Sequence, residues 1–133
     1  MCGIFGSINN NALKETYTGL KRLEYRGYDS FGYAALDGNT VQVKHQLGTL
    51  KDDVFNSDVQ FGTAIGHVRW ATHGEVSIEN AHPQKSNGFY VVHNGTVNNA
   101  PHDNLDTKWI AQLLNQHHGN INFVCNTIDG DNA

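Results

Sequence analysis

The second residue of the chain carries two groups that can take part in covalent catalysis. Cys2 comes directly after the initiator methionine, and the small Gly3 that follows makes Met1 a suitable substrate for removal. Without Met1, one residue supplies both a thiol nucleophile and a free α-amine, and an amine with a pKa of about 8 can accept the thiol proton. A Met-Cys start taken alone favours a plainer interpretation, which is a cysteine packed in a first strand. With Met1 retained, the amine is locked in an amide and the base is lost.

Four further runs of chemically suggestive residues follow in order along the chain. They are Leu23–Gly32, Gly66–Gly74, Asn80–Pro83 and Val91–Gly95. Together with Met1–Gly6, they resemble the glutaminase domain of the class II glutamine amidotransferases, whose nucleophile is an N-terminal cysteine. The resemblance extends to about Asn98 and resumes more faintly after Leu105. Within the family, the runs Tyr25–Ser30 and Arg69–Gly74 are most similar to the fructose-6-phosphate aminotransferase branch.

The resemblance implies a role for each matching residue. Cys2 attacks the side-chain carboxamide of glutamine, forms a thioester and releases ammonia, and Asn94 and Gly95 are the oxyanion donors. A neutral Asn amide and a Gly backbone that allows close approach suit this task. The implied substrate-binding residues are Arg69 on the α-carboxylate, Asp106 on the α-ammonium group, and Trp70, Thr72 and His73 on a loop that closes over glutamine, while Arg26 and Gly27 support the surroundings of the nucleophile.

Single matches have structural alternatives that the sequence leaves open. Asn94-Gly95 alone is a signal for a type I′ turn. Arg69 alone is typical of a surface ion pair. Asp106 alone is an acid in the first turn of a helix, where the macrodipole favours it.

Two departures from the family pattern support a second hypothesis for the function. Near Asp106, Leu105 stands where a hydroxyl residue is usual, and Lys108 replaces a glutamate. The second departure is the absence of the strands that, in the family, follow the helix expected here at Leu105–Gln116. The alternative to an active glutaminase is therefore a catalytically impaired glutamine-binding or interaction module that pairs with a larger amidotransferase.

The elements that position these residues are short strands and two helices, which predicts a mixed α/β chain with mostly antiparallel strands. Asp37-Gly38-Asn39 is a hairpin signal between two of the strands. Asn9-Asn10-Asn11 predicts a turn that caps the first helix. We expect strands at Gly3–Ile8, Phe31–Leu36, Thr40–Gln46, Phe61–Val68, Phe89–His93 and Ile121–Thr127, and helices at Ala12–Glu24 and Leu105–Gln116, the second with Asn104 as its N-cap.

The fold that the resemblance implies is an α+β sandwich of the N-terminal-nucleophile-hydrolase type, with αββα layers. We expect one glutaminase domain over residues 1–133, without the sugar-isomerase domain that accepts ammonia in the family. The family's sheets take further strands beyond the position of Ala133, so the expected fold is a shortened one. It is either a compact version, one completed by an acceptor or synthase chain or by a second copy, or a remnant.

Composition excludes several classes of function. The 133 residues carry 13 Asp and Glu against 9 Lys and Arg, a balance that argues against a nucleic-acid partner. No apolar run is long enough for a membrane helix. Two cysteines are too few for a disulfide scaffold, and Cys125 is expected to be a small buried residue. We expect a cytoplasmic protein that binds glutamine, with no cofactor and no metal, because the spacing of His67, His73, His82 and His93 matches no zinc site.

Overall fold

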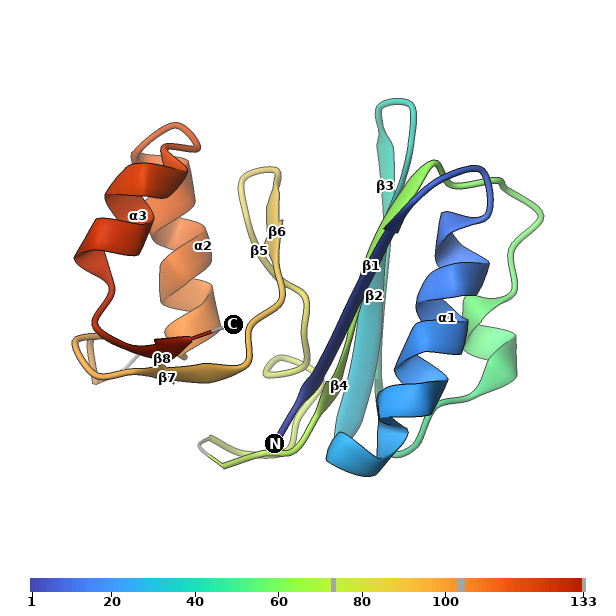
Figure 1. Cartoon of the computed structure of the whole chain (residues 1–133), viewed down its shortest axis with the longest axis horizontal. Coiled ribbons are helices and arrows are strands. Elements are labelled where there is room, and N and C mark those ends of the chain that lie inside the picture. Colours follow the sequence, from blue (N-terminus) through green and yellow to red (C-terminus); the bar gives the residue numbers. More distant parts are fainter. Residues whose placement is uncertain (73, 103–104, 133) are drawn as a thin grey trace. The chain divides into compact units, whose positions relative to one another are not determined.

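The computed structural model of the chain describes residues 1–72, 74–102 and 105–132 (Figure 1). Contacts within the chain form two compact units, Met1–Pro83 and Gln84–Ala133, and each unit is described by itself. That the chain acts as a single domain stays a prediction.

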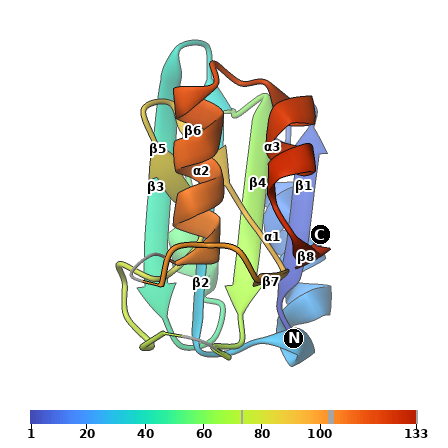
Figure 2. The ribbon, with the colours of Figure 1, turned by 90° about the vertical axis from the view of Figure 1, so that its left-hand side faces the viewer.

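A four-stranded antiparallel sheet forms the centre of the first unit. Its strands are β1 (Gly3–Ile8), β2 (Ser30–Asp37), β3 (Thr40–Leu47) and β4 (Thr63–Arg69), in the order β1-β4-β2-β3. Strand β4 lies between β1 and β2 (Figure 2). Because β4 is antiparallel to both, β1 and β2 begin at the end of the sheet where β4 stops. All four strands were predicted from the sequence, and their bounds agree within two residues.

Helix α1 (Ala12–Leu23) covers one face of this sheet (Figure 1). The helix packs against β1 and β4, and its buried side chains share one core with alternate residues of β2 and β4, because strand side chains on one face recur every second residue. The helix comes so close to β1 that a Cβ on Gly19 would lie 2.2 Å from the ring of Phe5. The core contains Ala12, Leu13, Leu20, Phe31, Tyr33, Ala35, Ala64 and Val68.

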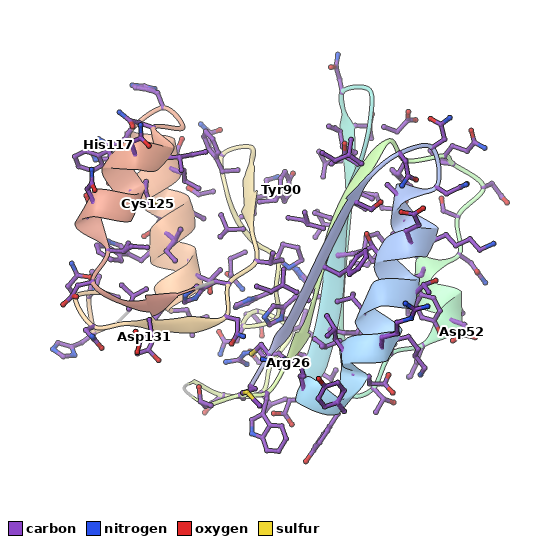
Figure 3. All side chains as sticks on the ribbon, viewed as in Figure 1. Arg26, Asp52, Tyr90, His117, Cys125 and Asp131 are labelled. Carbon is purple, nitrogen blue, oxygen red and sulfur yellow. The ribbon has the colours of Figure 1, made fainter. Side chains whose placement is uncertain are left out.

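Two 3₁₀ segments complete the first unit, namely η1 (Glu24–Arg26) and η2 (Asp52–Phe55). Figure 3 shows Asp52 on η2 beside α1. Tyr17 on α1 donates its hydroxyl to the Asp52 carboxylate, and this hydrogen bond raises the pKa of Tyr17 to about 12. The Phe55 ring packs on those of Tyr17 and Tyr33, with centroids 5.0 and 4.8 Å away. The segment between β3 and β4 is thereby fixed to the helix.

The second unit combines helices α2 (Asp106–Gln116) and α3 (Ile121–Thr127) with two small sheets. One sheet pairs β5 (Gln84–Ser86) with β6 (Phe89–Val91), and the other pairs β7 (Gly95–Val97) with β8 (Gly130–Asn132). Its buried core consists of Val97, Ile110, Leu113 and Val124. Every pairing in both units is antiparallel, as predicted.

The β5–β6 hairpin has a clear turn signal in the sequence. Asn87 and Gly88 connect the two strands, with φ values of 41° and 90°. Type I′ turns need positive φ at both central positions, and Asn-Gly is the preferred pair there. The predicted strand at Phe89–His93 is therefore one arm of a hairpin, and it ends earlier, at Val91.

Two predictions for the C-terminal part were wrong. Ile121–Thr127 is helical and not a strand, because the Asn120 side chain accepts a hydrogen bond from Phe123 N, 3.0 Å away, and so caps a helix. Cys125, labelled on α3 in Figure 3, is exposed and not buried.

The N-cap position of α2 is Leu105. Asn104, which was predicted to be the cap, lies outside the described residues.

Candidate active site

Cys2 is held at the start of β1 by two contacts. Its thiol donates to the carbonyl oxygen of Trp70, with Sγ and O 3.6 Å apart. Its own carbonyl accepts from Arg26 Nε at 2.8 Å, and Figure 3 shows Arg26 near the beginning of β1. Met1 is 69% exposed. The predicted nucleophile is thus anchored, while Met1, which blocks its α-amine, is accessible.

Arg69 is the last residue of β4 and is buried, with 5% of its surface exposed. The pairing of β1 with β4 ends at Gly3 and Val68, so the next residues, Cys2 and Arg69, come next to each other in the same register, and Arg69 still pairs with Ser30 of β2. The guanidinium donates through Nη1 to the carbonyl of Glu75, 3.2 Å away. A buried arginine here does not fit the alternative of a surface ion pair.

The residues after β4 form an exposed segment beside the nucleophile. Trp70 is 42% exposed, and its ring lies against that of Tyr28, with centroids 5.3 Å apart. Thr72 is also exposed. His73, predicted to bind substrate, lies outside the described residues.

Gly27 allows this segment to pass close to η1. A Cβ on Gly27 would lie 2.5 Å from the carbonyl carbon of Arg69 and 2.7 Å from Trp70 N. The first unit therefore brings together the predicted residues Cys2, Arg26, Gly27, Arg69 and Trp70.

In the second unit, a hydrogen bond connects the segment of Gly95 with Asp106. Gly95 is the first residue of β7 and pairs with Asn132. Asp106 begins α2, and its Oδ2 accepts from Val97 N at 2.8 Å. Asn94-Gly95 leads into a strand that pairs with β8, so it is not the turn of a two-residue hairpin. The alternative for Asp106, an acid in the first turn of a helix, describes its position.

Some buried histidine contacts in and near these segments were not predicted from the sequence. His93, just before Asn94, has its Nδ1 3.2 Å from the hydroxyl of Thr107, just after Asp106. In the first unit, the buried rings of His67 and His82 lie against each other with centroids 4.1 Å apart and planes tilted by 38°. Within the described part of the chain, no group of three or more His, Cys, Asp or Glu side chains is placed to hold a metal ion.

No family model matches the chain, but single known proteins are similar to it in sequence and in structure. A glutamine–fructose-6-phosphate aminotransferase (isomerizing) of Oceanobacillus iheyensis is 44% identical over 119 residues, which cover 85% of the chain and 19% of that protein. The enzyme of the same name from Legionella pneumophila is 36% identical over 89% of the chain and 23% of its own length. The chain thus spans about a fifth of the length of these curated relatives.

Solved structures share the fold over the whole chain. The glutamine phosphoribosylpyrophosphate amidotransferase of B. subtilis superposes with a TM-score of 0.78 at 24% identity and covers 100% of the chain and 34% of its own. A structure described as the allosteric regulatory enzyme of purine biosynthesis has a TM-score of 0.80 at 28% identity, with the same coverage.

The sequence relatives and the shared fold define a class: the chain belongs to the glutamine amidotransferases with an N-terminal nucleophile, and its fold is their α+β fold. Within that class, it is a homologue of the N-terminal part of glutamine–fructose-6-phosphate aminotransferases. Among the described residues, no helix is long and apolar enough to cross a membrane.

Proposed function

We propose that this chain is a glutaminase domain that hydrolyses the side-chain amide of glutamine and supplies ammonia to an acceptor. The observation that carries the proposal is the placement of Cys2, which follows an accessible Met1 and directly precedes β1, next in register to the buried Arg69 at the end of β4. Sequence relatives that are named glutamine–fructose-6-phosphate aminotransferases support it.

The reaction proceeds through a thioester. Once Met1 is removed, the free α-amine of Cys2 takes the thiol proton, and the sulfur attacks the amide carbon of glutamine. The C–N bond breaks as the α-ammonium group returns the proton to the leaving nitrogen, and ammonia departs. Water then hydrolyses the thioester to release glutamate and restore the thiol. The hydrolysis of each glutamine side-chain amide consumes one water molecule and yields one ammonia.

The remaining site residues have proposed roles in binding and in charge stabilisation. The planar guanidinium of Arg69 suits the two oxygens of the substrate α-carboxylate. Asp106 pairs with the α-ammonium group, and the Asn94 amide and the Gly95 N–H donate to the oxyanion. Trp70, Thr72 and His73 cover the bound glutamine. Arg26 fixes the Cys2 carbonyl through its 2.8 Å hydrogen bond, and Gly27 lets the Arg69–Trp70 backbone pass close by.

The acceptor of the ammonia is proposed to lie outside these 133 residues. The relatives extend well beyond the matched segment, which covers 19% and 23% of the two proteins compared above. We propose that residues 1–133 act as one glutaminase domain in the cytoplasm, with the acceptor on a further domain, on a synthase chain or in a homo-oligomer. The reaction as written needs no cofactor.

The test is ammonia release from glutamine by protein whose Met1 has been removed. Cys2→Ala is expected to abolish release, while Cys125→Ser, at the exposed second cysteine, is expected to leave it unchanged. Release that survives Cys2→Ala would contradict the proposed nucleophile.

The test also separates the second candidate, an impaired binding or interaction module. Lys108 and Leu105, which provides no side-chain cap for α2, motivate that alternative. Glutamine binding without ammonia release by processed protein would favour it.

A further inference from the structure

Asp29 connects the backbone on both sides of Trp70 to the start of β2. Its N–H donates to the carbonyl of Arg69 at 3.0 Å, and its Oδ2 accepts from the N–H of Ala71 at 2.8 Å. Its own carbonyl accepts from Gly48 N at 3.0 Å, which ties the same residue to the end of β3. The N–H, the C=O and one carboxylate oxygen of Asp29 therefore hold neighbouring segments.

The peptide group between Trp70 and Ala71 has a contact at each end. Its N–H is held by the Asp29 carboxylate, and its C=O accepts from the thiol of Cys2. A peptide plane is rigid, so fixing the N–H also fixes the direction of the carbonyl. A charged acceptor on the N–H also polarises the group and strengthens the bond that its carbonyl accepts.

We propose that Asp29 is a positioning residue that orients the Cys2 thiol through the Trp70–Ala71 peptide. The inference rests on the proposed glutaminase function and adds a residue to that site. Asp29 needs no contact with glutamine for this role. Without its carboxylate, the peptide loses the acceptor that sets its orientation, and the thiol loses a fixed partner. The chemical step is expected to suffer more than binding, because Arg69 keeps its place in the sheet.

Three substitutions separate positioning from general damage. Asp29→Ala removes the acceptor, whereas Asp29→Asn keeps an oxygen that can accept from Ala71. Asp58→Ala removes an exposed carboxylate elsewhere in the same unit. Because one hydrogen bond to a charged group is lost, Asp29→Ala should lower kcat by about ten- to a hundredfold with little change in KM. Asp29→Asn should recover most of that loss, and Asp58→Ala should match wild type.

A second readout does not depend on turnover. In a Trp109→Phe background Trp70 is the one tryptophan left, since the chain has two. Acrylamide should quench its fluorescence more strongly in Asp29→Ala, because the carboxylate no longer holds the backbone around Trp70. In Asp29→Asn and Asp58→Ala, the quenching should equal that of wild type. Thermal unfolding of each variant confirms that the quenching refers to folded protein.

Two outcomes overturn the inference. One is an active wild-type protein together with an Asp29→Ala variant whose kcat lies within about threefold of the wild-type value, because the loss of one charged hydrogen bond should lower kcat by more than that. The other is unchanged Trp70 quenching in folded Asp29→Ala. If wild type itself releases no ammonia, the proposed function fails, and the quenching alone decides whether Asp29 positions the peptide.

Discussion

At the scale of single residues, Arg69 provides a test of substrate binding. Arg69→Lys keeps the positive charge but loses the planar pair of donors that matches a carboxylate. We expect KM for glutamine to rise by about ten- to a hundredfold, with a smaller effect on kcat, because ground state and transition state both keep the α-carboxylate. Steady-state kinetics checks this, with Arg22→Lys on the exposed side of α1 as the matched control. An unchanged KM would remove Arg69 from the binding role.

Asn94 provides the corresponding test of charge stabilisation. Its amide is proposed to donate to an oxyanion that exists only in the transition state. Asn94→Ala should therefore lower kcat by about a hundred- to a thousandfold while KM changes little. The exposed Asn98 is a matched control, and Asn98→Ala should leave both constants unchanged. A large rise in KM with normal kcat would show that Asn94 binds substrate instead.

At the scale of elements, the cap of α3 explains why this segment is helical. Asn120→Ala removes the acceptor for Phe123 N and should reduce the free energy of unfolding by about 1 kcal/mol. Asn120→Asp keeps an acceptor and should stay close to wild type. Urea unfolding measures both. Equal stability of the alanine and wild-type proteins would mean that the cap contributes little to the helix.

Element by element, local signals in the sequence explain which predictions were correct. Short apolar runs and the Asp37–Asn39 turn predict the strands of the first unit, and the observed bounds agree within two residues. The Ile121–Thr127 segment was misassigned because its β-branched and aromatic residues favour a strand, while the cap that decides for a helix is the single preceding residue Asn120. The Asn87-Gly88 pair is a local signal for the turn of the β5–β6 hairpin.

For the site, the resemblance to the family predicts which residues take part, and the roles of all of them stay predictions. The adjacency of Cys2 and Arg69 follows from the antiparallel pairing of β1 with β4. The bonds of Asp29 to the backbone around Trp70 depend on how two loops meet after folding, which no local pattern encodes.

At the scale of the whole molecule, His45 makes stability depend on pH. Its Nε2 donates to the Pro83 carbonyl at 2.9 Å, and burial lowers its pKa although this hydrogen bond opposes the shift. Between the folded pKa and the unfolded value of about 6.5, the unfolded chain binds more protons, so the free energy of unfolding rises with pH. This contribution is complete above about pH 6.5 and is lost as the pH falls through the folded pKa.

The variant His45→Gln isolates that contribution, because glutamine keeps an N–H donor but does not titrate. Urea unfolding between about pH 7.5 and 5.5 should show a smaller loss of stability in the variant than in wild type. Identical losses in the two proteins would show that His45 does not contribute to the pH dependence.

The most direct test of the central claim is the intact mass of the protein before and after exposure to a glutamine analogue in which a diazoketone replaces the carboxamide. The starting mass identifies the fraction that has lost Met1. We predict that this fraction gains one adduct with loss of dinitrogen, that Cys2→Ala gains none, and that Cys125→Ser behaves like wild type. Processed wild type that gains no adduct, or an adduct that persists in Cys2→Ala, would contradict a glutamine site built around Cys2.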